Sequence, residues 1–406
     1  MHQALPTCNR ERFMRLRLLC VTLTLSAACT PHANVGSPSP DQTVSYVTRL
    51  GSDTVTVETY RRSGNHLDAD IMQRSPMTYV ARSSIELNQA GLATTWVFDP
   101  RLVSGARPPN APTRTLTMGT DSTTVVSDTG AQFQRRVRGG PAIPSVTNSM
   151  LSWQLAIDYA RAQKTDSAPL ISTTGTHSWI PILFLDKNTV RSFGGGPIYP
   201  ITITLDDNGR IVRYDGSRTT NKIISTRATG IEVRTIASAF SVRDQTAGAM
   251  GATSPRDTAR AQIAGAQLWI DYGRPSLRGR DVWRNGVLGD TLWRTGANAA
   301  TQFKTDVDLR ISGVTIPAGM YTLWTHVLPR NSAYELVFNK QVGQWGAGAN
   351  VYDPKNDLAR VPLTVRQRTN SAERFTMSIE PGGDGGVIAM QWGGTRLETP
   401  FTIVRK

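Results

Sequence analysis

Apolar and polar residues alternate with a period of two over much of residues 43–243. Successive side chains of a strand point to opposite faces, so this pattern predicts half-buried β-strands. Residues 54–60 and 201–205 are clear cases. The second run is followed by Asp206-Asp207-Asn208-Gly209 and a further alternating run at residues 210–214. An Asn-Gly pair between two such runs predicts a β-hairpin, and not a calcium loop.

The same region contains further predicted strands and one predicted helix. The strands lie at residues 77–87, 93–99, 114–118, 123–127, 179–185, 222–227 and 231–237, as in an antiparallel meander. The helix starts near residue 150, where apolar residues recur at helical spacing, and Ser145 or Thr147 is its predicted N-cap. One helix against a curved sheet predicts a half-open barrel, a scaffold that can hold an apolar ligand in its mouth.

A second β-rich region follows a short linker. Residues 244–255 are small, polar and glycine-rich, which is typical of a segment between domains. Alternation then returns, with predicted strands at residues 261–272, 300–309, 319–326, 334–339, 361–367, 374–380, 387–392 and 398–404. Closely spaced strands without a long helix predict a β-sandwich or jelly roll over residues 256–406. The chain is therefore expected to be mainly β, with two antiparallel β domains.

The first 29 residues have the pattern of an export signal. Basic residues precede a short apolar run at residues 16–25, which is too short to span a bilayer as a helix. Ser26-Ala27-Ala28-Cys29 then resembles a bacterial lipoprotein signal, in which a lipid on Cys29 would anchor the chain to a membrane. Leu25 lies one place further from the cysteine than the usual pattern has it, and ordinary cleavage near Ala28 is the alternative. Residues 30–42 form a polar tether.

Composition narrows the classes of function. The formal net charge is +14, from 45 Lys and Arg against 31 Asp and Glu, but the excess is spread evenly along the chain. Nucleic-acid binders usually cluster such charge and interleave it with aromatic residues, so no nucleic-acid partner is predicted. The only cysteines are Cys8, Cys20 and Cys29. The expected folded domains therefore have no disulfide, no thiolate metal site and no cysteine nucleophile.

No catalytic motif is visible. The chain has no Gly-x-Ser-x-Gly motif, so a serine hydrolase of the α/β type is not supported. The three histidines of the expected domains, His66, His177 and His326, lie far apart and show no metal-ligand spacing. We therefore predict no catalytic residue, no metal and no cofactor.

Several spaced motifs of the C-terminal region carry a family resemblance. They lie at residues 271–276, 279–280, 292–298, 316–323, 337–340, 344–346 and 352–353. In this order they resemble the bacterial family known as domain of unknown function 2911, over residues 254–404. The resemblance implies an exported, β-rich protein and no particular activity. Relatives usually carry an acid where this chain has Ala299, either for a ligand or as a partner for Arg280 or Arg294. No family resemblance is found in residues 43–243.

The polar residues of these motifs are the candidate ligand-binding residues. They are Arg274, Arg280, Arg294, Asn298, Asn339 and, with an aromatic face, Trp345. Guanidinium groups bind carboxylates and phosphates through two parallel hydrogen bonds, and nearby glycines such as Gly273 and Gly296 allow a close backbone approach. An anionic or sugar-like ligand fits this set. The alternative is that these groups only fix loops, with the arginines paired to nearby aspartates and the asparagines capping turns.

The sequence thus favours an exported, lipid-anchored envelope protein that binds a small ligand or an envelope protein and catalyses nothing. One alternative is an envelope hydrolase or lyase that uses Arg274, Arg294 and Asn298. The other is a structural or assembly protein.

Overall fold

The computed structural model describes residues 43–128, 133–193, 200–219, 222–283, 292–328, 333–344 and 352–405. Trp345 and Cys29, two residues of predicted function, lie outside these ranges, as do the predicted signal and tether. The described residues belong to one compact unit. They are mainly strand, so the predicted mainly β chain with large antiparallel sheets is confirmed.

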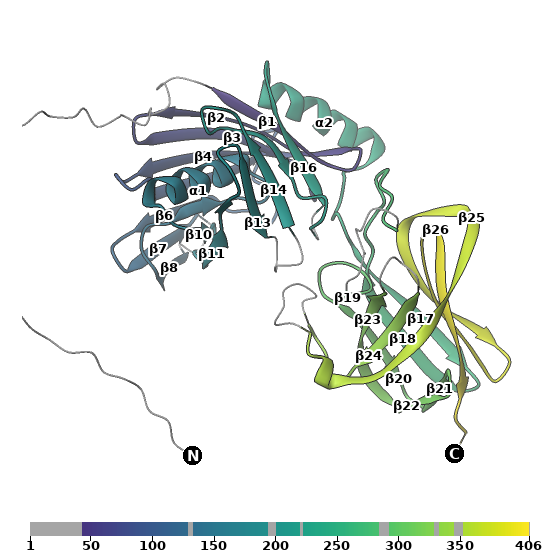
Figure 1. Ribbon diagram of the computed structural model, residues 1–406. Helices are drawn as coiled ribbons and strands as arrows, with labels where there is room; N and C mark the ends of the chain where they lie inside the picture. Colours follow the sequence, from purple (N-terminus) through teal and green to yellow (C-terminus); the bar gives the residue numbers. More distant parts are fainter. Residues whose placement is uncertain are drawn as a thin grey trace, which may run out of the picture. The chain divides into compact units, whose positions relative to one another are not determined.

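The N-terminal region is built on a 13-stranded antiparallel sheet (Figure 1). Eight strands come first in the chain: β1 (Val44–Leu50), β2 (Asp53–Ser63), β3 (His66–Gln73), β4 (Tyr79–Leu87), β5 (Ala93–Leu102), β6 (Arg114–Met118), β7 (Ser122–Ser127) and β8 (Phe133–Arg138). Five follow later: β12 (Leu183–Phe184), β13 (Thr189–Phe193), β14 (Pro200–Leu205), β15 (Ile211–Asp215) and β16 (Ile223–Ala228). Each group is a meander, and the pairing of β1 with β16 joins the two.

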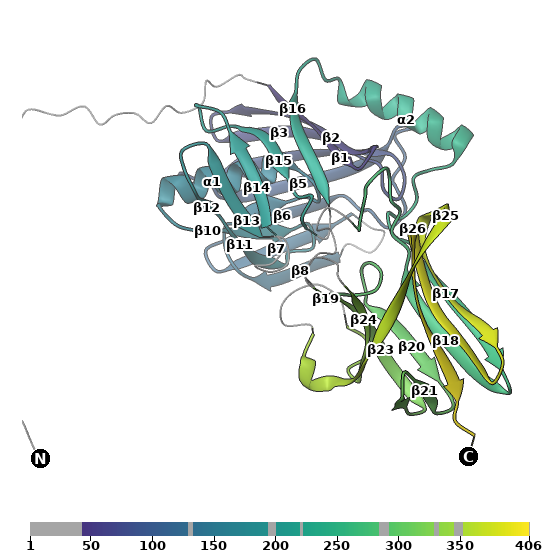
Figure 2. The same ribbon diagram turned by 45° about the vertical axis from the view of Figure 1, so that its right-hand side comes forward.

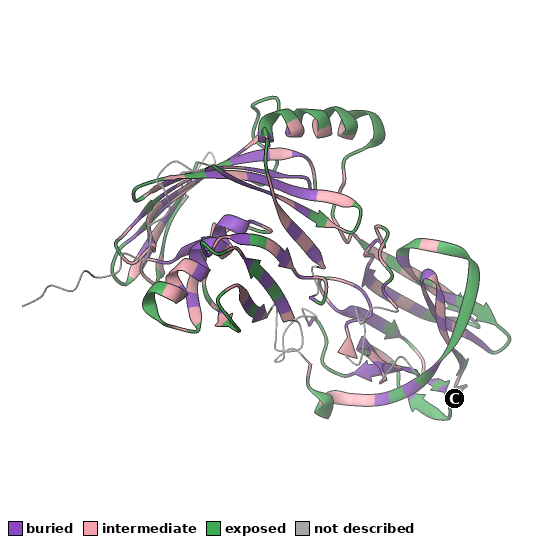
Figure 3. Ribbon diagram, turned by 45° about the horizontal axis from the view of Figure 1, so that its top comes forward, coloured by how far each residue is buried: buried purple, intermediate pink, exposed green. Residues whose placement is uncertain are grey.

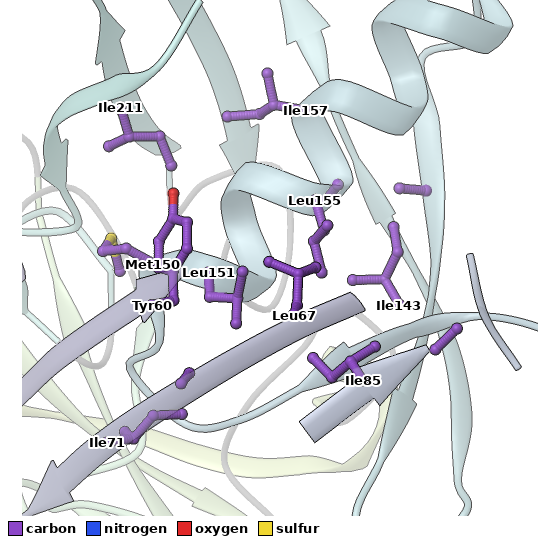
Figure 4. Packing of buried hydrophobic residues seen from close by; sticks show 14 of the residues in the cluster. Tyr60, Leu67, Ile71, Ile85, Ile143, Met150, Leu151, Leu155, Ile157 and Ile211 are labelled. Carbon is purple, nitrogen blue, oxygen red and sulfur yellow. The ribbon is translucent and has the colours of Figure 1, made fainter. Parts of the chain in front are cut away.

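Helix α1 (Met150–Gln163) and a three-stranded sheet pack on one face of this large sheet. The small sheet consists of β9 (Ile143–Ser145), β10 (Ser167–Ser172) and β11 (His177–Pro181). Figure 4 shows Met150, Leu151 and Leu155 of α1 among residues of β2, β3 and β4. Burying this apolar stripe stabilises the helix, since short helices are marginal alone.

The start of α1 differs from the prediction. Its N-cap is Ser149, and not Ser145 or Thr147. Ser145 ends β9, so its backbone is already paired in a sheet. The buried carboxylate of Glu58 on β2 also accepts hydrogen bonds from the Ser149 hydroxyl and from two backbone N–H groups of the first turn. Burial raises the pKa of Glu58 to about 7, against the lowering effect of these hydrogen bonds.

A second helix, α2 (Val233–Ala247), corrects two predictions. Residues 231–237 do not form a strand, and the predicted linker at 244–255 begins inside this helix. Val233, Ile236, Ala237 and Phe240 recur at helical spacing and pack on apolar side chains of β2, β3 and β4, on the face opposite α1. Figure 2 shows α2 lying along these strands. The short alternation at its start masked the longer helical period.

The C-terminal region forms a ten-stranded sheet that folds over its own core. Its strands are β17 (Arg256–Ile263), β18 (Ala266–Gly273), β19 (Leu292–Trp293), β20 (Thr301–Thr305), β21 (Leu309–Ile311), β22 (Val314–Ile316), β23 (Gly319–Val327), β24 (Tyr334–Asn339), β25 (Asp357–Gly382) and β26 (Gly385–Ile403), with a 3-10 turn, η2, at Pro354–Asn356. The long strand β25 pairs first with β24 and then with β26, so hydrogen bonding continues from one layer into the other. Figure 3 shows buried residues alternating with exposed ones along these strands.

Three predicted strand boundaries are wrong here. Residues 261–272 are a hairpin of β17 and β18, because Ala264 and Gly265 adopt positive φ and turn the chain. Residues 361–367 and 374–380 are parts of the single strand β25, and residues 387–392 and 398–404 both lie largely within β26. The alternation of apolar and polar residues can continue through a tight turn and can be interrupted within one long strand. It therefore predicts where strands lie better than how many there are.

The turn between β1 and β2 contacts the C-terminal region directly. The Ser52 N–H donates to the Arg278 carbonyl oxygen at 2.9 Å, and the Arg278 guanidinium pairs with Asp53. Gly51 has a φ of +61°, and a Cβ there would lie 1.9 Å from that same carbonyl oxygen. Only glycine fits at this contact.

Candidate functional site: a basic cavity

A cavity of about 880 Å³ is lined by side chains of both large sheets. This volume lies within the range of pockets that hold small molecules. Most of its described lining comes from strand ends and from the loops that follow them. Its lining includes Leu50, Val55, Phe98, Trp153, Ile201, Tyr214, Lys222, Ile223, Thr253, Arg280, Trp293, Arg294, Ala297 and Asn298.

One wall of the cavity is apolar. Leu50 on β1 and Ile223 on β16 are cross-strand partners, and both line it. Ile201 and Val55 add aliphatic surface from β14 and β2, and these side chains belong to or pack on the main hydrophobic cluster of the N-terminal region. The cavity therefore opens directly onto the apolar interior of the 13-stranded sheet.

Positive charge is concentrated on another part of the lining. Lys222, Arg280 and Arg294 all line the cavity, and none of its described lining residues is acidic. Arg294 is only 7% exposed. Placing three cations around one concave, partly buried space focuses the positive potential there and favours an anion.

Backbone carbonyls orient these three side chains. The Arg294 Nη1 donates to the Asn298 oxygen at 2.8 Å, and the Arg280 Nε donates to the Leu277 oxygen at 2.7 Å. The Lys222 Nζ donates to the Thr219 oxygen at 3.2 Å. Such hydrogen bonds fix the side chains before a ligand arrives, which lowers the entropy lost on binding.

The environment of the cavity shifts the pKa values of two of these cationic side chains. Burial lowers the pKa of Lys222 to about 7, and the nearby charges of Arg280 and Arg294 act in the same direction. Burial also lowers the pKa of Arg280 to about 10; the charge of Arg278 lowers it further, and the Glu373 carboxylate acts in the opposite direction. Burial and like charge disfavour the protonated forms, and a bound anion would offset both effects.

The loop that carries Arg294 and Asn298 has an unusual backbone. Thr295, Gly296 and Asn298 have φ values of +51°, +154° and +63°. A Cβ on Gly273 would lie 2.1 Å from the Ala297 carbonyl oxygen, so the end of β18 and this loop can approach only because residue 273 is glycine. The expected close backbone approach at Gly273 is thus present. It holds the loop against the sheet.

Trp293, at the end of β19 just before this loop, is mainly a packing residue. Its ring lies 4.9 Å from that of Phe375 and 5.8 Å from that of Trp392, between centroids. The Trp293 Nε1–H donates to the Gly296 oxygen at 2.9 Å. These contacts fix the position of Arg294 next to it.

The structure brings together three of the six predicted site residues: Arg280, Arg294 and Asn298 line the cavity. Arg274 does not line it. Its Nη1 pairs with Asp257 at 2.8 Å and its Nε donates to the Phe375 oxygen, which ties β18 to β17 and β25. The sixth residue, Trp345, lies outside the described residues.

Asn339 is fully buried and does not line the cavity either. Its Nδ2 donates to the Asp353 oxygen at 3.0 Å and to the Asp357 Oδ1 at 2.9 Å. These bonds fix the start of β25 beside the end of β24. The loop-fixing alternative therefore describes Asn339 and Arg274 well.

Ala299, where the family resemblance implies an acid, lies beside Arg256. The Arg256 Nη1 donates to the Ala299 oxygen at 2.8 Å, and this guanidinium also pairs with Asp271.

Sequence reasoning missed Lys222. It is an isolated lysine at the start of a predicted strand, and nothing in its neighbours marks it as part of a site. Its role depends on the pairing of β16 with β1, which places it beside Leu50 and Ile223. Such long-range pairing is not encoded in local pattern.

Other candidate chemistry is limited in the part of the chain that the structure describes. No three His, Cys, Asp or Glu side chains in these ranges are grouped to hold a metal ion. His326 pairs with Glu335 at 3.1 Å, and His66 pairs with Glu86 at 2.6 Å, both away from the cavity lining. Among the same residues, no helix has the length and apolar character needed to cross a bilayer.

Fold and site together define a mainly β protein with a basic, partly apolar cavity. Residues 254–401 match the family model described as "Protein of unknown function (DUF2911)". The match contains Arg280, Arg294 and Asn298, and it confirms the family resemblance of the C-terminal region. No recognised family covers the N-terminal region. The comparison with curated proteins finds no match.

Proposed function

We propose that this is an exported, non-catalytic binding protein that holds a small ligand in the basic cavity. The observation that carries the proposal is the convergence of Arg280, Arg294 and Asn298, from two separate motifs, on one cavity of about 880 Å³. Pockets of this size, with a largely apolar wall and a few convergent polar groups, are the usual form of a small-molecule site.

The enzyme alternative has less support. It needs Arg274, Arg294 and Asn298 around one reacting group, whereas Arg274 is engaged with Asp257 away from the cavity lining. A hydrolytic mechanism also needs a positioned acid or base, and the described lining includes neither a carboxylate nor a histidine. Binding is what the arrangement serves best.

Export and membrane attachment belong to the same proposal. They are supported by the basic and apolar segments before Cys29 and by the small residues Ser26, Ala27 and Ala28. In this proposal a lipid on Cys29 attaches the protein to an envelope membrane, and residues 30–42 act as a tether for the binding domain.

Filling the cavity tests the proposal. Thr253 is a half-buried loop residue of the lining, so Thr253→Trp should occupy part of the space without disturbing a strand. We expect saturable binding of the neutral fluorescent probe N-phenyl-1-naphthylamine to wild type and at least about tenfold weaker binding to the variant, as steric loss of a pocket implies. Thr258→Trp, on an exposed position of β17, is the matched control. Absence of saturable binding, or equal binding to Thr253→Trp, would contradict the cavity as the site.

A further inference from the structure

We propose that the ligand is an amphiphilic anion, with one hydrocarbon chain on the apolar wall and an anionic head against Lys222, Arg280 and Arg294. This inference rests on the proposed function and names its ligand class. A fatty acid and a single-chain phospholipid share this chemistry.

The charge of the head follows from the lining. Three cationic side chains and no described acid line the cavity, and the three differ in sequence position and in the element that carries them. Lys222 precedes β16, Arg280 follows β18, and Arg294 follows β19. Guanidinium and ammonium groups bind carboxylate and phosphate oxygens through charge-assisted hydrogen bonds, which are about twice as strong as neutral ones. Carbonyl groups hold these side chains in position, as described above.

The hydrocarbon chain follows from the other wall. Leu50, Val55, Ile201 and Ile223 present aliphatic side chains, and Phe98 adds an aromatic one. They belong to or pack on the hydrophobic cluster under α1, so a chain that enters here leaves water for an apolar interior. Each CH₂ group that is transferred from water to this interior adds to the affinity, so chain length is expected to be the main source of affinity.

The junction of the two walls argues for one molecule that has both parts. Lys222 and Ile223 are adjacent in sequence and both line the cavity, and Ile223 pairs with Leu50. Trp293 and Arg294 repeat this apolar–basic adjacency on the other sheet. A free inorganic anion would leave the apolar wall in water, and a neutral lipid would make no charge-assisted hydrogen bond with the cationic side chains.

The experiment is displacement of N-phenyl-1-naphthylamine from the mature protein by matched probes below their micellar concentrations. Tetradecyl sulfate has the chain and a permanent charge, tetradecanol has the chain alone, and inorganic sulfate has the charge alone. We expect tetradecyl sulfate to bind about tenfold more tightly than tetradecanol, as a charge-assisted contact implies, and sulfate at millimolar concentration to displace nothing.

Two further sets of measurements test whether the charge preference arises in the cavity and which kind of lipid supplies the ligand. Lys222→Gln should weaken the binding of tetradecyl sulfate about tenfold and leave the affinity for tetradecanol unchanged. Lys187 is exposed, pairs with Asp207 and lies outside the lining, so Lys187→Gln should change neither affinity. Myristate and 1-myristoyl-lysophosphatidylglycerol then distinguish a fatty acid from a phospholipid source. Tighter binding of either than of tetradecanol supports the proposal.

The outcomes separate this inference from the proposed function. Equal affinities of tetradecyl sulfate and tetradecanol, or displacement by sulfate alone, would overturn the amphiphilic anion and leave the cavity as a binding site. An unchanged tetradecyl sulfate affinity in Lys222→Gln would place the anionic head elsewhere and also overturn the inference. Loss of probe binding from every protein, wild type included, would instead contradict the proposed function.

Discussion

At the scale of single residues, the site depends on where like charges are placed. Lys222, Arg280 and Arg294 line one cavity, and burial, together with the nearby charges of Arg280 and Arg294, lowers the pKa of Lys222 to about 7. Of these residues, Arg280 and Arg294 could be proposed from the sequence, because glycines and aromatics mark their motifs. Lys222 could not, since only the β1–β16 pairing places it in the lining.

The lowered pKa of Lys222 predicts a pH-dependent affinity. The charged groups that act on it are Arg280 and Arg294, which favour its neutral form, while a bound anion favours the ammonium. Binding of an anion therefore takes up a proton, and the affinity for tetradecyl sulfate should fall as the pH rises through 7. We expect a decrease of about tenfold between pH 6 and pH 9, measured by titration calorimetry in buffers of different ionisation heat.

Two controls isolate this effect. Tetradecanol binding should not change over the same pH range, and Lys222→Gln should bind tetradecyl sulfate with a flat profile. If the affinity of Lys222→Gln for tetradecyl sulfate depended on pH as steeply as that of wild type, the titrating group would be another residue.

At the scale of elements, close contacts between turns and strands hold the cavity walls. Gly51, in the β1–β2 turn, contacts the Arg278 carbonyl oxygen, and Arg278 lies in the segment just before Arg280. Gly273 does the same for the loop that carries Arg294. Both contacts pack backbone against backbone and leave no room for a side chain.

Gly51→Ala tests the first of these contacts. The added Cβ would lie 1.9 Å from the Arg278 carbonyl oxygen and would also strain a residue at φ +61°. We expect a loss of about 2–4 kcal/mol in the free energy of urea-induced unfolding, combining strain and the lost contact. Gly64→Ala has nearly the same φ, +60°, and no atom within 4 Å of its Cβ, so it should cost only about 1 kcal/mol. Equal losses in the two variants would show that the contact has no energetic weight.

The elements also show how far the sequence predicts the fold. Strand β24 was predicted at its exact residues, and so was the hairpin at Asp206–Gly209, because alternation and Asn-Gly are local signals. The start of helix α2 lies in a predicted strand, residues 231–237, because Ile231 and Val233 alternate with polar residues before the helical spacing becomes visible. The continuity of β25 between two layers depends on partners far away in the chain, which local pattern does not contain.

At the scale of the whole molecule, the proposed protein is a binding domain attached to a membrane. In this proposal the cavity binds the ligand, and the segment before residue 30 provides the attachment. A protein that takes single-chain lipids would encounter them at a membrane surface, and its excess of Lys and Arg over Asp and Glu would favour anionic ones.

The attachment predicts a specific effect of Cys29→Ser. The variant cannot carry a thioether-linked lipid, so it should move from the membrane fraction to the soluble fraction of the envelope, or stay unprocessed at its signal. Metabolic labelling with a radioactive fatty acid and fractionation measure this. Cys20→Ser, within the apolar segment of the signal, is the matched control and should keep both label and location. Labelled Cys29→Ser protein would contradict lipidation at this residue.

The most direct test of the central claim is a crystal structure of the mature protein with tetradecyl sulfate. The account predicts the sulfate within hydrogen-bonding distance of Lys222 and at least one of Arg280 and Arg294, with the alkyl chain along Leu50 and Ile223. A sulfate bound outside the cavity, or a chain that leaves this apolar wall empty, would contradict it.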